Sequence, residues 1–345
     1  MADLVLKELG PKRIQIPLAT SPVHLTTVLR RAPQTADIND KSFPIPGVEL
    51  DFLDVKPAIA SYRRMVRGVE FDMCALAPTT YYIARAYGAP FKALPIFASR
   101  RFHHAGLLVR PDAGINGPKD LIGKKVGVRA YSVTTGVWTR GILENEYGVK
   151  ASDINWVVDD EEHVTKMPLP PFVSHVPEGK SLASMMASGE IQAGFAANAG
   201  IGREGKPTEG WEAKERPEAK TYRELFPNAA ELGAEWYKRT GILPFHGVIV
   251  IKDDILKKHP WIAKSVYEAF YKSKENWLKK FKSGEANSKD DEKYRKLVPI
   301  IGEDPMPYGI KANLPSINAL IDYAVQQRLM PKRLSVEELF IDPDA

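Results

Sequence analysis

The chain has 345 residues, 44% of them hydrophobic and 26% charged, a composition typical of a globular protein of about two domains and not of a disordered chain. Its 48 Lys and Arg residues are interleaved with 43 Asp and Glu residues, so the formal charge of +5 comes without the long basic runs of nucleic-acid-binding segments. No stretch reaches the ~18 uninterrupted apolar residues that cross a membrane, and the single cysteine, Cys74, excludes an intramolecular disulfide.

Strand-like and helix-like segments alternate along the first third of the chain, which is the pattern of an α/β protein. The apolar runs predict strands at 13–19, 47–55 and 71–78, and two more within 92–111, separated by a bend at a basic cluster. Helices are predicted at 58–68 and at 79–88, the second capped by Thr79 and ended by Gly88.

A second series of the same kind follows. It predicts a strand at 124–130, a helix from about Thr135 to Tyr147 that ends at Gly148, a strand at 153–159, a helix at 181–189 and a strand at 191–197. Residues 199–222 are rich in Gly, Pro and charge, which predicts a long surface loop. A strand within 243–256 and helices at 260–281 and 315–329 complete the chain.

This order of elements predicts two lobes, with the chain returning to the first. The first lobe comprises 1–105 and 241–345, and the second, 106–240, is inserted between them. The strand-to-helix turns "LAPTTYY" and "RAYSVTTGV" occupy corresponding places in the two lobes. Ligands bind at the carboxyl ends of strands in open α/β sheets, and helix N-termini favour anions. The sequence therefore predicts a cleft between the lobes that accepts carboxylates.

Hydroxyl side chains gather at both turns. Ser132, Thr134 and Thr135 precede one helix, and capping needs only one hydroxyl, so the others are candidates for ligand binding. Thr79 and Thr80 repeat this arrangement at the other turn, where a helix cap followed by core aromatics is the alternative interpretation.

The basic cluster lies in "ASRRFHHAG", residues 98–106. In an extended segment, side chains alternate in direction, so Arg100, Phe102 and His104 share one face and Arg101 and His103 share the other. We predict that the first face lines the cleft, with a guanidinium, an aromatic ring and an imidazole, and that the second faces solvent. The alternative is that the whole cluster is a solvated edge.

His246 lies where the chain crosses back to the first lobe, which makes it either a second cleft residue or a buried core histidine. The sequence has no HExxH or CxxC motif for a tightly bound metal, no GxGxxG or P-loop for a nucleotide, and no GxSxG elbow. We therefore predict no cofactor, although a weakly bound divalent metal held by carboxylates and hydroxyls would leave no spacing signature.

The stretches 61–110, 120–149 and 243–256 resemble the 4,5-dihydroxyphthalate decarboxylase family, which is itself similar to periplasmic type II solute-binding proteins. The resemblance extends over roughly 13–329 and implies two α/β lobes, two crossing strands and a ligand cleft between the lobes. Two family patterns, Ser-Arg-x-Phe-x-His and Tyr-x-x-Thr, fall on Ser99, Arg100, Phe102 and His104, and on Tyr131 and Thr134. Many relatives have a glutamate before that tyrosine where this chain has Ala130, a departure that concerns the identity of the substrate more than the fold.

The resemblance implies decarboxylation of a small anionic hydroxylated aromatic carboxylate or dicarboxylate, such as 4,5-dihydroxyphthalate. A ring hydroxyl would supply electrons while an acid protonates the carbon that loses CO2. Arg100 would hold the retained carboxylate, and His104 is the first candidate for the acid and His246 the second. Further substrate contacts are expected from Thr79, Thr80, Ser99, Phe102, Tyr131, Ser132, Thr134 and Thr135.

The alternative is a non-catalytic protein of the same scaffold that binds an aromatic or other small carboxylate, since fold does not separate the two functions. No signal peptide is visible, which favours the enzyme and a cytoplasmic location, whereas a removed leader would indicate the periplasm. We expect neither a nucleic acid nor a membrane as partner. The exact substrate and the oligomeric state, including a homo-oligomer, stay open.

Overall fold

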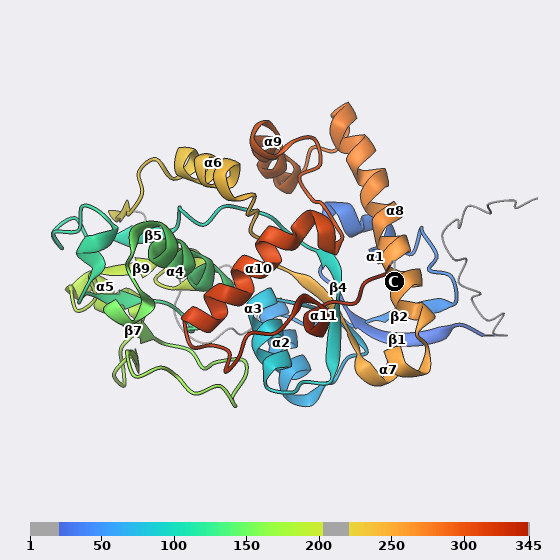
Figure 1. Ribbon diagram of the computed structural model, residues 1–345, viewed down its shortest axis with the longest axis horizontal. Helices are drawn as coiled ribbons and strands as arrows, with labels where there is room; N and C mark the ends of the chain where they lie inside the picture. The colour runs from blue at the N-terminus through green and yellow to red at the C-terminus, as the bar shows by residue number, and fades with distance from the viewer. Residues whose placement is uncertain (1–20, 203–220, 344–345) are drawn as a thin grey trace, which may run out of the picture.

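The computed structural model describes residues 21–202 and 221–343, whose strands form two sheets lying at opposite ends of the molecule (Figure 1). The first sheet has the order β2-β1-β3-β11-β4. Its strands β1 (Val23–Val28), β2 (Val48–Phe52) and β3 (Met73–Leu76) are parallel. Strand β11 (Val248–Lys252) runs antiparallel between β3 and β4 (Phe91–Phe97).

The second sheet has the order β10-β5-β9-β6-β7-β8. Strands β6 (Lys125–Gly127), β7 (Asn155–Val158), β8 (Val173–His175) and β9 (Ala193–Phe195) are parallel, and β5 (Leu107–Val109) and β10 (Arg223–Glu224) complete it by antiparallel pairing. The chain thus leaves the first sheet after β4 and returns to it at β11. The predicted two-lobed α/β architecture is confirmed, and the lobe boundaries stay a prediction.

Helices surround both sheets (Figure 1). With the predicted lobe boundaries, the first lobe carries α1 (Ala36–Asn39), α2 (Ala58–Gly68), α3 (Pro78–Ala86), α7 (Asp253–Lys258), α8 (Trp261–Ser283), α9 (Lys289–Ile301), α10 (Ile310–Gln326) and α11 (Val336–Leu339). The second carries α4 (Thr134–Tyr147), α5 (Leu182–Ser188) and α6 (Ala229–Thr240). In the described part of the chain, no helix is long and apolar enough to span a membrane.

Local signals predicted several of these helices closely. Helix α2 covers the predicted residues 58–68, and α4 ends where Gly148 adopts a φ of 71°, in the left-handed region that favours glycine. The prediction that Thr79 caps α3 is wrong, because the helix begins at Pro78 and the Thr79 hydroxyl donates instead to the Ser132 carbonyl at 2.8 Å. Strand β1 and helices α6 and α9 were not predicted. The strand predicted at 13–19, and most of the loop predicted at 199–222, lie outside the described residues.

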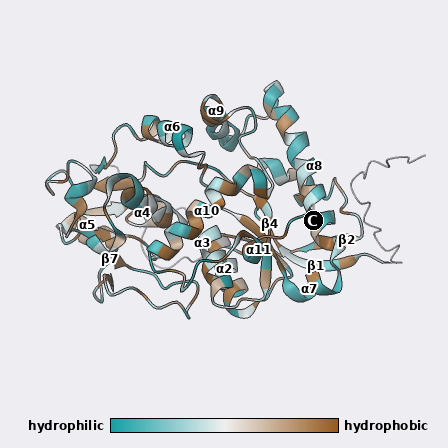
Figure 2. Cartoon of the chain, in the orientation of Figure 1, coloured by the Kyte–Doolittle hydropathy of each residue, from teal (hydrophilic) through white to brown (hydrophobic). Residues whose placement is uncertain are grey.

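Of the three apolar cores in the described residues, two are large. One lies between the first sheet and α8, along which Figure 2 shows both hydrophilic and hydrophobic residues. It contains Leu25, Ile251 and Phe270. The other continues from the opposite face of that sheet into the second lobe. Helix α10 carries this core across, because it packs on α4 so closely that a Cβ at Gly141 would lie 1.9 Å from the Tyr323 ring.

Candidate functional site

A pocket of about 290 Å³ lies between the lobes, and we call it the interlobe pocket. The carboxyl ends of β1, β3, β6, β7 and β9 supply its walls, together with the crossing segments before β5 and β11. It is lined by Arg30, Ile59, Tyr62, Ala77, Thr80, Ser99, Arg101, Arg129, Ala130, Ser132, Val133, Thr134, Thr135, His163, Asn198, Ala199 and His246. Strand ends from both sheets therefore meet at one site, as expected for ligand binding in α/β proteins.

The interlobe pocket is strongly positive. Three arginines line it, and the lining that the structure describes contains no carboxylate. Arg129 is neutralised by Asp160 at 2.7 Å, whereas among the described residues Arg101 donates only to the Thr135 hydroxyl, at 2.9 Å. Within the two described ranges, Arg30 makes neither a hydrogen bond nor an ion pair. Two guanidinium groups are therefore available to a ligand, and Arg binds carboxylates through two parallel hydrogen bonds.

The hydroxyl side chains predicted at the starts of α3 and α4 divide into two groups. Ser132, Thr134 and Thr135 line the pocket, as does Thr80, whose hydroxyl lies 2.9 Å from His163 Nδ1. Thr79 does not line it; its hydroxyl lies 2.7 Å from that of Thr134, and the two link the starts of α3 and α4.

Tyr131 is wholly buried and does not line the pocket either. Its ring lies under the Arg140 guanidinium, 4.0 Å from the ring centre, and its hydroxyl donates to the Gln327 carbonyl. Its amide and that of Ser132 donate to the buried Glu162 carboxylate, at 2.6 and 3.1 Å. The amides of Tyr131 and Ser132 are thus already occupied by Glu162.

The basic segment alternates as predicted. Arg101 is exposed to solvent, as predicted, and also borders the interlobe pocket, whereas the face predicted to line the cleft is largely covered. Phe102 lies 6.3 Å from Tyr237, and His104 lies edge-on to Trp236 at 5.5 Å, so both pack against α6. His104 is buried there. It lines neither the interlobe pocket nor a second, neighbouring cavity that is described below. Its predicted place on the cleft wall is therefore wrong, because α6 covers that face.

Arg100 lies on the same face and is also buried. Its guanidinium donates to the carbonyls of Leu243 and Pro307, at 3.0 and 2.8 Å, and to the Asn313 side chain. It stacks on the Phe97 ring at 4.7 Å. Arg100 does not line the interlobe pocket, so its guanidinium cannot clamp a carboxylate there.

His103 and His246 form a close pair. Their Nε2 atoms lie 2.5 Å apart, so one ring donates a proton to the lone pair of the other. His103 is only 1% exposed and lies parallel to the Trp138 ring, which contradicts its predicted exposure to solvent. His246 is half-buried and lines the interlobe pocket. Burial and nearby Arg101 lower the pKa of His246 well below its usual range, and burial does the same to the pKa of His103.

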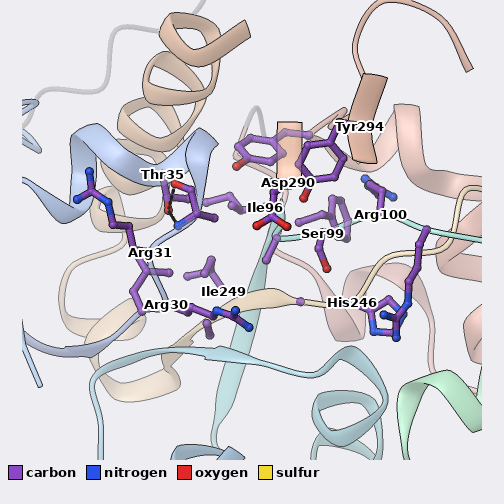
Figure 3. A pocket seen from close by; sticks show the side chains of 18 of the residues that line it. Arg30, Arg31, Thr35, Ile96, Ser99, Arg100, His246, Ile249, Asp290 and Tyr294 are labelled. Carbon is purple, nitrogen blue, oxygen red and sulfur yellow. Dashed lines mark hydrogen bonds between the residues drawn. The ribbon is translucent and has the colours of Figure 1, made fainter. Parts of the chain in front are cut away.

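A second cavity, of about 410 Å³, opens beside the interlobe pocket within the first lobe, and we call it the lobe-1 cavity (Figure 3). The two share Arg30, Tyr62, Ser99, Arg101 and His246. Figure 3 shows Asp290 and Tyr294 of α9 on one side and Arg30 and Ile249 on the other. Arg100 and Phe102 also contribute to its wall.

Sequence reasoning missed Arg30, Tyr62 and His163. Arg30 follows the end of β1 by two residues, at the edge of the sheet where ligands bind, but β1 itself was not predicted. Across the described ranges, no group of three or more His, Cys, Asp or Glu side chains could hold a metal ion.

Comparison with known proteins gives one family model, described as NMT1/THI5 like, over residues 46–168. A 4,5-dihydroxyphthalate decarboxylase of Comamonas testosteroni is 32% identical over 313 residues, which cover 87% of this chain and 91% of that protein. A 4,5-dihydroxyphthalate decarboxylase of Pseudomonas putida is 34% identical over 185 residues, 51% of this chain and 71% of that protein.

Two solved structures are similar in fold. The periplasmic aliphatic sulphonate binding protein SsuA from Escherichia coli aligns with a TM-score of 0.51 at 14% identity, over 93% of this chain and 98% of that one. The desulfurization enzyme DSZB aligns with a TM-score of 0.50 at 13% identity, over 94% of this chain and 97% of that one. Both match the type II periplasmic-binding-protein architecture described above.

Proposed function

Because this chain belongs to the 4,5-dihydroxyphthalate decarboxylase family, we propose that it is a carboxy-lyase that removes one carboxylate, as CO2, from a hydroxylated aromatic dicarboxylate. The observation that carries the proposal is the charge of the interlobe pocket. Arg30 and Arg101 border it with no carboxylate partner in the part of the chain that the structure describes, beside the hydroxyls of Ser132, Thr134 and Thr135. This set of groups complements a small ligand with two negative charges and several oxygens.

His246 is the proton donor in this proposal. It borders the pocket beside Arg101, and His103 holds its ring from behind. A ring hydroxyl para to the leaving carboxylate supplies electrons, and the His246 imidazolium gives its proton to the carbon that bears this carboxylate. The bond to the carboxyl carbon then breaks and its electron pair returns to the ring. The products are CO2, the protonated ring carbon and a neutral imidazole.

Substrate charge supports this role for His246. Burial and Arg101 keep the pKa of His246 low, which favours the neutral ring. A bound dicarboxylate brings two negative charges next to the ring, and opposite charges favour the charged form of an imidazole. We therefore expect one proton to be taken up with the substrate. Calorimetry in buffers of different ionisation enthalpy measures that proton.

The decisive experiment is incubation of the purified protein with 4,5-dihydroxyphthalate and related hydroxylated aromatic acids. Release of CO2 with a change in ring absorbance supports the proposal. Tight binding of these acids without turnover would instead favour a non-catalytic carboxylate-binding protein. Absence of both binding and turnover across the panel would contradict the proposal.

A further inference from the structure

Residues 160–163 follow β7 in the second lobe and contact helix α2 of the first lobe. Arg63 of α2 donates to the Asp160 carboxylate at 2.7 Å and to the Glu161 carbonyl at 3.2 Å. The Asp160 oxygen that accepts from Arg63 also accepts from Arg129 of the interlobe pocket, at 2.7 Å. The side chains of Arg63, Asp160 and Arg129 are 16%, 3% and 9% exposed, so solvent screens this triad little. One buried carboxylate therefore joins an arginine of one lobe to a pocket arginine of the other.

A second arginine of α2 holds the same segment through its backbone. Arg67 donates to the carbonyls of Glu162 and His163, at 2.8 and 3.0 Å. The His163 ring also meets the first lobe, because its Nδ1 atom lies 2.9 Å from the Thr80 hydroxyl of α3. These contacts tie the backbone of the segment, and not only its side chains, to the first lobe.

The opposite side of the segment shapes the interlobe pocket. The Glu162 carboxylate accepts from the amides of Tyr131 and Ser132, at 2.6 and 3.1 Å, and so fixes the turn that precedes α4. His163 itself lines the pocket, as does Ser132. The two arginines of α2 do not line it, so their contacts reach a ligand only through residues 160–163. The segment thus connects the docking of the lobes to the geometry of the pocket.

We propose that Arg63 and Arg67 are positioning residues for the interlobe pocket, which place Arg129 and the turn before α4 only when the two lobes are docked. Ligand affinity then depends on docking, because the apparent dissociation constant rises as the docked fraction falls. By the same linkage, a bound ligand favours the docked state. The inference rests on the proposed function only in treating the interlobe pocket as the ligand site.

Binding of phthalate, a diacid without ring hydroxyls, tests this inference without turnover. Arg63→Gln and Arg67→Gln should each weaken binding by about tenfold in calorimetry, because each removes charge-assisted hydrogen bonds that hold the docked state. Arg63→Lys keeps a positive charge near Asp160 and should restore part of the affinity. Arg64→Gln is the matched control, because it removes the same charge from the same helix, where Arg64 pairs with Glu70 of its own lobe. The control should bind phthalate as the wild type does.

Two further measurements separate positioning from a general loss of structure. In the Arg63→Gln/Arg67→Gln double variant, small-angle scattering without ligand should give a larger radius of gyration than in the wild type, and saturating phthalate should reverse the increase. With a hydroxylated substrate, KM should rise while kcat stays near the wild-type value, because saturating substrate restores docking. A radius of gyration or a phthalate affinity equal to that of the wild type would overturn the proposal. Weaker phthalate binding by the variants of a protein that releases no CO2 from any hydroxy acid contradicts the proposed reaction alone.

Discussion

Residues 100–104 present two faces to the protein, and each face carries one arginine and one histidine. Arg100 and His104 lie on the face that is closed over by backbone carbonyls and by α6. Arg101 and His103 lie on the other, where Arg101 borders the interlobe pocket and His103 contacts His246. The residue types are the same, so the difference shows that the element covering a face, and not its composition, decides which cations meet a ligand.

The largest expected effect concerns the proton donor. His246→Asn should lower kcat by about 10²–10⁴-fold, the usual contribution of a positioned general acid. His104→Asn is the matched control, because it removes an imidazole from the covered face, and it should keep most of the wild-type kcat. Steady-state CO2 release measures both. If His104→Asn loses activity and His246→Asn does not, the assignment of the two faces is wrong.

Replacing Arg101 is expected to reduce activity nearly as much, by weakening substrate binding. Arg101→Gln is expected to lower kcat/KM by about 100-fold, equivalent to about 3 kcal/mol for a charge-assisted contact. Arg110→Gln serves as the control, since Arg110 pairs with Asp112 and lines neither cavity. An unchanged kcat/KM in Arg101→Gln would show that the carboxylates bind elsewhere.

The burial of His104 should affect how the free energy of unfolding depends on pH. Burial lowers the pKa of His104 to about 4, below the value near 6.5 of an unfolded histidine. The unfolded chain therefore binds the proton first, and stability falls as pH decreases from about 6.5 to about 4, by about 2 kcal/mol after allowance for solvent screening. His104→Phe should remove this part of the loss in urea titrations. An identical loss in the variant would mean that His104 is not buried against α6.

The smallest effect is expected for His103, which we interpret as a positioning residue. His103→Phe should lower kcat by about tenfold and shift the alkaline limb of the pH–rate profile, because His246 acts in its protonated form and loses its partner. His103→Gln keeps a donor near the same place and should restore part of the rate. If both variants retain the wild-type pH profile, His103 serves only packing.

Much of the fold follows from local sequence signals. The turn residues and apolar periodicity of α2 and α4 are contained within each segment, so their limits were predicted within a residue or two. Thr79 shows where local signals fail. Its hydroxyl donates to the carbonyl of Ser132, which lies 53 residues away in the sequence and on the other lobe. Helix-capping rules consider only residues close in sequence, so they could not predict this partner.

The site was predicted less well, for the same reason. A period of two divides residues 100–104 into two faces correctly, but only the position of α6 shows which face is covered, and α6 was not predicted. The contact between His103 and His246 joins residues 143 apart in the sequence. Arg30 depends on β1, which was also missed. The positive cleft itself was predictable, because strand ends and helix starts recur at corresponding places in both lobes.

Helix α10 has a mechanical consequence. Two crossing segments alone would form a hinge about which the lobes could swing apart. Two further contacts join the lobes. The Tyr323 ring packs against Gly141, and Arg63 of α2 forms an ion pair with Asp160 at 2.7 Å. Swinging open would break both contacts, and Gly141→Ala, which places a methyl group against the Tyr323 ring, should loosen the packing between α4 and α10.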